Sequence, residues 1–142
     1  MKAKLPRTWV LTPPPSYGYV EIAETCLNFC DTDHTGDAHI HPLDLWHQQH
    51  GPSMTVSVTD TAEPPEPDEV LAVSIDQRPH DLDPAARVPH ARVEVSGGVW
   101  SEAMDPEAFA AFIDQLAGHV ERLRGFHTVL VQAIAEHGAG AE

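Results

Sequence analysis

Apolar and polar residues alternate in several short stretches between residues 8 and 103, which is the pattern of half-buried β-strands. The clearest example is residues 90–96, where the pattern points Ala91, Val93 and Val95 inward. Gly97-Gly98 then supplies a favoured two-residue hairpin turn, after which residues 99–103 would return antiparallel. We predict further strands at residues 8–12, 18–23, 53–59 and 69–76.

After residue 104 the apolar residues recur every three or four positions, which predicts an amphipathic helix. Asp105 suits the N-cap, Pro106 the first helical position and Glu107 the positive end of the helix dipole. The helical region covers residues 105–137, either as one long helix or as two helices with a bend at Gly125. Its apolar face consists of Phe109, Phe112, Ile113, Leu116, Val120, Leu123, Phe126, Val129, Leu130, Ala133 and Ile134.

Strands first and helix last predict an α+β fold, in which the helix packs on an antiparallel sheet of about four to five strands. The chain of 142 residues suits a single domain. We expect a cysteine- and histidine-rich loop at residues 26–51, strands at 53–103, the helical region at 105–137 and a tail at 138–142. If the helix is longer than the sheet can cover, residues 126–134 would form a homodimer or bind another partner.

The loop at residues 26–51 contains both cysteines of the chain and five of its ten histidines. Cysteine and histidine are the residues that hold structural zinc, at tetrahedral geometry and with four ligands. Cys26, Cys30 and His34 follow one another at four-residue spacing, so that their side chains can converge on one ion. His50 is the first choice for the fourth ligand, because it lies at the start of the strand at 53–59 and next to a glycine that lets the loop close. His47 is the second choice, followed by His39 and His41.

Two simpler interpretations of the cysteines remain open. The thiols could be small buried apolar groups beside surface histidines, or Cys26 and Cys30 could form a disulfide that closes a short loop. A catalytic zinc is a further alternative, because spare groups for a general base lie nearby, namely the surplus histidines and Asp31, Asp33, Asp37 and Asp44. Two thiolates with histidine favour a closed structural site, and the sequence contains no His-Glu-x-x-His motif.

The run Cys26-x-x-Phe29-Cys30-x-x-Asp33-His34 resembles a family of small uncharacterised actinobacterial proteins with a Cys-Pro-x-Trp-Cys-x-x-Asp-His signature. The resemblance extends over roughly residues 24–123 and includes a C-terminal helix that opens in the family with a phrase like Thr-Pro-Asp-Glu-Ala, where this chain has Met104-Asp-Pro-Glu-Ala108. This chain departs from the signature at Leu27 and Phe29, where the family has proline and tryptophan. The resemblance implies the fold and the metal site, and it implies no activity.

Charge limits the partners that the protein can have. Twenty-two acidic and eight basic residues give a formal net charge of −14, which repels nucleic acid and favours a basic protein partner. No apolar run is long enough to span a membrane and the N-terminus does not have the pattern of a secretory signal, so we expect a cytoplasmic protein with free thiolates. The sequence therefore predicts a zinc-binding interaction or regulatory module, with a zinc-dependent hydrolase as the alternative.

Overall fold

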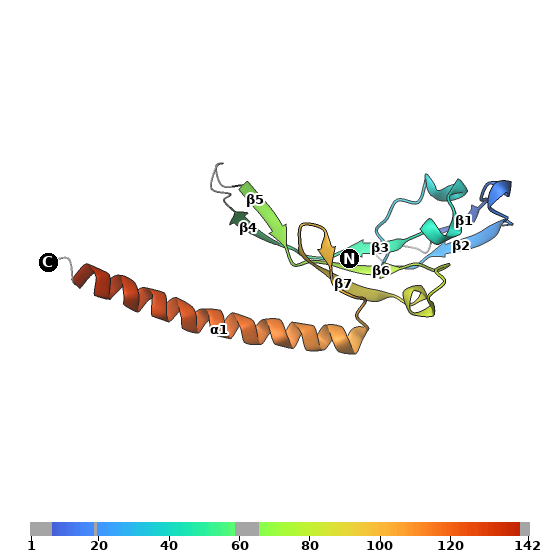
Figure 1. Ribbon diagram of the computed structural model, residues 1–142. Coiled ribbons are helices and arrows are strands. Elements are labelled where there is room, and N and C mark those ends of the chain that lie inside the picture. Colours follow the sequence, from blue (N-terminus) through green and yellow to red (C-terminus); the bar gives the residue numbers. More distant parts are fainter. Residues whose placement is uncertain (1–6, 19, 59–65, 140–142) are drawn as a thin grey trace. The chain divides into compact units, whose positions relative to one another are not determined.

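The computed structural model describes residues 7–18, 20–58 and 66–139. The predicted α+β class is confirmed, because antiparallel strands are followed by one C-terminal helix (Figure 1). The contacts within the chain group into two compact units, a sheet unit of residues 1–105 and a helical unit of residues 106–142. The two units are therefore described separately.

The central sheet of the first unit has four strands in the order β3-β6-β7-β8, and every neighbouring pair is antiparallel. These strands are β3 (His47–His50), β6 (Ala72–Gln77), β7 (His90–Ser96) and β8 (Val99–Trp100). Two further antiparallel pairs join β1 (Arg7–Leu11) to β2 (Ile22–Cys26) and β4 (Met54–Val58) to β5 (Glu66–Val70). Short 3-10 turns lie at Pro15–Tyr17, Asp37–His39, Pro42–Asp44 and Pro84–Arg87.

Strands β3 to β6 form one long hairpin with a kink in its middle. The pairs His50↔Ser74 and Met54↔Val70 share one register, since four residues separate their members on each side. At the kink, the Gly51 amide donates to the Val73 carbonyl at 2.7 Å. Leu71 on the opposite side has a φ of 53°, a left-handed conformation that is unusual for leucine. The strand predicted at residues 69–76 is therefore divided into β5 and β6 at Leu71.

The turn between β7 and β8 follows the prediction from sequence. Gly97 has a φ of 51° and Gly98 a φ of 84°, so both central residues adopt the positive φ that a type I′ hairpin turn requires. The strand before the turn, β7, has the bounds predicted for residues 90–96. Ala91 and Val93 are buried as expected, whereas Val95 is exposed near the end of the strand.

The apolar core of the sheet unit is small. Among the described residues, the buried hydrophobic side chains are Leu11, Cys26, Cys30, Leu45, Ala91 and Val93. Polar and charged side chains are buried beside them, namely Glu24, His34, His47, Ser74 and Asp76. A small domain with few buried apolar groups needs an additional source of stability, such as a bound metal.

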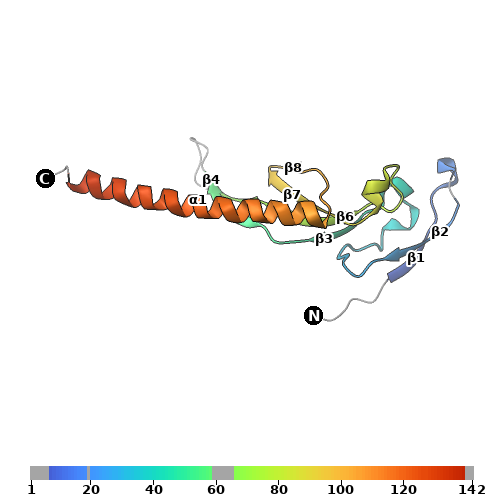
Figure 2. The same ribbon diagram turned by 90° about the horizontal axis from the view of Figure 1, so that it is seen from below.

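The helical unit contains one continuous helix, α1 (Pro106–Ala139), with 34 residues and no interruption at Gly125 (Figures 1 and 2). None of the residues of α1 is buried. Within the described part of the chain, no helix combines the length and the apolar character needed to cross a bilayer.

Candidate metal centre

Four buried side chains from three segments of the sheet unit meet at one point. Cys26 is the last residue of β2, Cys30 and His34 belong to the loop that follows, and His47 is the first residue of β3. One ligand atom from each residue lies within 4.8 Å of all the others. In a tetrahedral zinc site with bonds of about 2.0–2.3 Å, the ligand atoms are about 3.3–3.8 Å apart, which is close to this spacing.

His34 is oriented from both sides of its ring. Its Nδ1 donates to Asp37 Oδ2 at 2.7 Å, and its Nε2 lies 3.3 Å from Cys30 Sγ. The ring stacks on Trp9 with a centroid separation of 4.6 Å and an interplanar angle of 18°. The carboxylate of Asp37 therefore fixes the tautomer that leaves Nε2 available to a metal.

His47 has the same arrangement with its two ring nitrogens exchanged. Its Nε2 donates to Glu24 Oε1 at 3.2 Å, and the second oxygen of Glu24 accepts a hydrogen bond from His80 Nε2 at 2.7 Å. Its Nδ1 is buried and has no hydrogen-bond partner. A buried nitrogen without a partner is costly in a folded protein unless something binds it. The two imidazoles thus offer His34 Nε2 and His47 Nδ1 next to the two sulfurs.

The electrostatics of the cluster favour a thiolate. Burial alone would raise the pKa of Cys30, but His34, His47, the Cys26 thiol and the backbone of Gln48 together lower it from 9.0 to about 6. Cys30 is then ionised at neutral pH, and the thiolate is the form that binds metal.

Glu24 and His47 shift each other's titration. Burial would lower the pKa of His47, but the hydrogen bond to Glu24 and the charge of Cys30 raise it above its ordinary value. Burial would raise the pKa of Glu24, but hydrogen bonds from His47 and His80 lower it. The negative charge of the Cys30 thiolate and the Glu24 carboxylate, both close to His47, would favour a cation at the cluster.

The structure places three of the four predicted ligands, Cys26, Cys30 and His34, in this cluster. His50 is not among them, because its side chain is 72% exposed and its Nδ1 lies 3.2 Å from Asp31 Oδ1. Residues 47 and 50 of a strand point to opposite faces, so only one of them can reach the sulfurs. The position expected for His50 is filled by His47, the second choice.

The two remaining candidates also lie outside the cluster. His39 Nδ1 contacts the Thr12 carbonyl oxygen at 2.9 Å, and His41 Nδ1 accepts from the Leu43 amide at 3.1 Å. Both imidazoles take part in local contacts of the loop.

Glu24 and His80 were not singled out from the sequence, and Asp37 was considered there as a carboxylate for a catalytic zinc and not as the partner of His34. Glu24 precedes Cys26 by two residues in β2, so strand alternation places both on one face, and this signal was available. Asp37 follows His34 by three residues, a spacing at which a turn brings side chains together. His80 lies 56 residues beyond Glu24, and no local pattern connects them.

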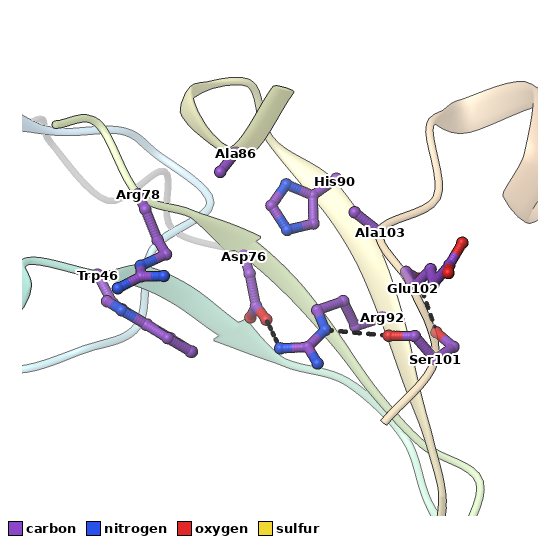
Figure 3. A pocket seen from close by; sticks show the side chains of 9 residues that line it. All are labelled: Trp46, Asp76, Arg78, Ala86, His90, Arg92, Ser101, Glu102 and Ala103. Atoms are coloured by element: carbon purple, nitrogen blue, oxygen red, sulfur yellow. Dashed lines mark hydrogen bonds and ion pairs between the residues drawn. The ribbon is translucent and has the colours of Figure 1, made fainter. Parts of the chain in front are cut away.

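The described residues of the sheet unit line cavities both at the cluster and away from it. A cavity of about 160 Å³ borders the cluster and is lined by Thr8, Trp9, Asp33, His34 and Thr35. A second, of about 210 Å³, is lined by residues from β6, β7 and neighbouring loops (Figure 3). There the Arg78 guanidinium lies over the Trp46 ring, with its carbon 5.0 Å from the ring centroid, and Arg92 lies 4.0 Å from the buried carboxylate of Asp76. The charges of the second cavity thus largely balance one another.

The fold and the cluster define a small α+β protein with a buried Cys2His2 group that could hold a metal ion. A family model described as "Domain of unknown function (DUF6907)" matches residues 9–132, so the chain belongs to that family. The resemblance to an uncharacterised family is confirmed in this respect, while the actinobacterial source and the signature stay predictions. No match was found among curated proteins or among solved structures.

Proposed function

We propose that Cys26, Cys30, His34 and His47 bind one zinc ion that stabilises the sheet unit. The observation that carries this proposal is the orientation of the two imidazoles. Each has one ring nitrogen on a carboxylate and directs the other toward the sulfurs, and His47 Nδ1 is buried without a partner. Carboxylate–histidine pairs of this kind are typical of metal sites, and mixed sulfur and nitrogen ligands are typical of zinc.

The ligand set supports a structural role for the ion. Four protein ligands complete a tetrahedron, whereas a catalytic zinc keeps one position for water. All four residues are buried. The hydrolase alternative lacks a comparable supporting observation, so we favour the structural site.

A structural ion would add stability where the core supplies little. Zinc binding to small structural sites provides about 10–16 kcal/mol at neutral pH. The ion would connect the β1–β2 pair, through Cys26, to the first strand of the central sheet, through His47. These segments belong to separate ladders, so the metal would join parts that strand pairing does not join.

Metal analysis with a matched pair of variants tests the site. We expect one zinc per chain in the purified protein, loss of zinc in His47→Ala and in Cys30→Ala, and unchanged zinc in His50→Ala. His47 and His50 are three residues apart in one strand, so the pair separates metal binding from the loss of any histidine. Cobalt substitution should give sulfur-to-cobalt charge-transfer bands. Full zinc content in His47→Ala, or none in the native protein after zinc loading, would contradict the proposal.

The biological role that we propose is that of a cytoplasmic interaction or regulatory module, in which zinc holds the loop at residues 26–51 in shape for a basic protein partner. The support is the net charge of −14, together with the need of free thiolates for a reducing compartment. A pull-down from native lysate, with zinc-loaded and chelator-treated protein compared at low and high salt, tests it. We expect a basic protein to be retained by the zinc-loaded form and released by salt. Equal retention by both forms would contradict the role of zinc.

A further inference from the structure

The apolar side chains of α1 follow a seven-residue repeat. One line of the repeat contains Phe109, Leu116, Leu123 and Leu130, and the other contains Ile113, Val120, His127 and Ile134. The steps between the two lines alternate between four and three residues along the whole stretch. This is the a/d pattern of a coiled coil, with β-branched residues at three of the four a positions and leucine at three of the four d positions.

The side of α1 opposite to the a/d seam carries residues that are unsuited to an apolar interface. Gly118, Gly125 and Gln132 recur at the f position, which faces away from the a/d seam. A glycine in a helix interior costs about 1 kcal/mol relative to alanine. The two glycines therefore lie seven residues apart, as the seam positions do, on the side opposite to the seam.

The seam of α1 runs along most of a long helix. A helix of 34 residues is about 51 Å long at 1.5 Å per residue. Six of the eight seam residues are exposed and the other two, Phe109 and Leu116, are partly exposed; Leu123, near the middle, is 53% exposed. An isolated helix with such a face gains stability only by packing it against something of similar length.

We propose that α1 pairs with α1 of a second copy of the chain as a parallel, in-register, two-stranded coiled coil. Ile and Val at a with Leu at d favour two strands over three or four. The occupant is a copy because it has the same length and the same period.

The area is sufficient for a stable pair. The seam from Phe109 to Ile134 is about 39 Å long, and the a, d, e and g positions cover about half of a helix surface that is roughly 10 Å across. This corresponds to on the order of 600 Å² per copy, so two copies bury more than the roughly 1,000 Å² that marks a biological interface.

The flanking positions favour the parallel orientation. In a parallel pair, a g residue faces the e residue of the following heptad in the other helix. Phe126 at g would then contact Val131 of the second copy, and these side chains are 73% and 52% exposed in one chain. His127 at a would face His127 of the second copy, and one polar a position fixes the register of a coiled coil at some loss of stability.

Sedimentation of the full zinc-loaded chain tests the pairing. At about 50 µM we expect twice the 15.5 kDa mass of one chain, falling toward one chain on dilution. Leu123→Glu at d should weaken pairing at least roughly a hundredfold, while the matched control Gln132→Glu at f should leave it unchanged. Glutamate is a good helix former, so circular dichroism of concentrated samples separates a lost interface from a broken helix. Because α1 contains none of the four cluster residues, the outcome does not depend on the metal.

Two further variants test the register and the orientation. His127→Ile should tighten the pair about tenfold or more, because it replaces the polar a position. Ile134→Cys should form a disulfide between copies with oxidised glutathione if the helices are parallel, and the unsubstituted chain serves as the control. A single-chain mass for the native protein at about 50 µM, a larger assembly, or an unchanged mass for Leu123→Glu would overturn the inference. Absence of the Ile134→Cys crosslink in a two-chain species would overturn the parallel orientation.

Discussion

Replacing Glu24 with glutamine changes the charge behind His47 without changing the shape of the side chain. Glu24 is buried in β2 and its two oxygens accept hydrogen bonds from two histidines, at 3.2 Å from His47 and 2.7 Å from His80. Glutamine keeps one accepting oxygen and replaces the other by an amide that only donates. One of the two imidazoles therefore loses its acceptor, and the other loses a charged one.

The expected magnitude follows from these contacts. A hydrogen bond to a charged group contributes about 1.5–3 kcal/mol. Loss of a carboxylate behind a ligating histidine typically weakens metal binding about 10–100-fold, or about 1.4–2.7 kcal/mol. We expect Glu24→Gln to weaken zinc binding within this range. The free energy of unfolding of the zinc-loaded protein should fall by a similar amount, since zinc stabilises the folded form by mass action.

Competition with a chromophoric zinc chelator measures the affinity, and thermal melts with and without zinc measure the stability. Glu21→Gln is the matched control, because Glu21 is exposed just before β2 and the substitution removes the same charge. Equal loss of affinity in both variants would show that net charge, and not orientation of His47, is responsible. Unchanged affinity in Glu24→Gln would refute the role that we assign to the carboxylate.

Three further predictions concern pH and two glycines. The pKa of Cys30 is lowered from 9.0 to about 6. Ionisation of this thiol therefore contributes its full stability above pH 9.0, and the contribution is lost as the pH falls through about 6. A zinc-binding dye should report steeply increasing zinc release below about pH 6. Gly51→Ala would place a Cβ 2.9 Å from the Val73 carbonyl oxygen, so the free energy of unfolding measured with urea should fall by about 1–3 kcal/mol. The control Gly36→Ala faces open space and should lower it by less than about 0.5 kcal/mol. Gly125→Ala, also facing open space, should stabilise α1 by about 1 kcal/mol in thermal melts.

The elements predicted correctly are those in which local chemistry and tertiary structure agree. Gly97-Gly98 determines its turn because both positions need positive φ, and Asp105 and Pro106 mark the start of α1. The interrupted strand was missed because nothing local signals a left-handed leucine at Leu71. That conformation follows from the kink of the long hairpin, where Gly51 approaches the opposite strand.

The candidate site was predictable to the extent that it is local. Cys26, Cys30 and His34 meet as their four-residue spacing suggested, whereas metal binding itself stays a prediction. The choice between His47 and His50 depended on β3, a strand that the sequence pattern does not predict. Its residues are His-Gln-Gln-His, with no apolar residue to give an alternating pattern. The pairing of β3 with β6, which is a contact between distant residues, determines which histidine faces the sulfurs.

The place of His47 on β3, the strand at one end of the central sheet, has a consequence for how the chain folds. If β3 slipped by one residue along β6, Gln48 would replace His47 beside the thiols, and a glutamine amide is a poor ligand for this kind of ion. A metal that binds only when β3 and β6 are in the correct register stabilises that register and not the shifted one. The ion would thereby favour the correct register of β3, which the polar residues of this strand specify only weakly by themselves.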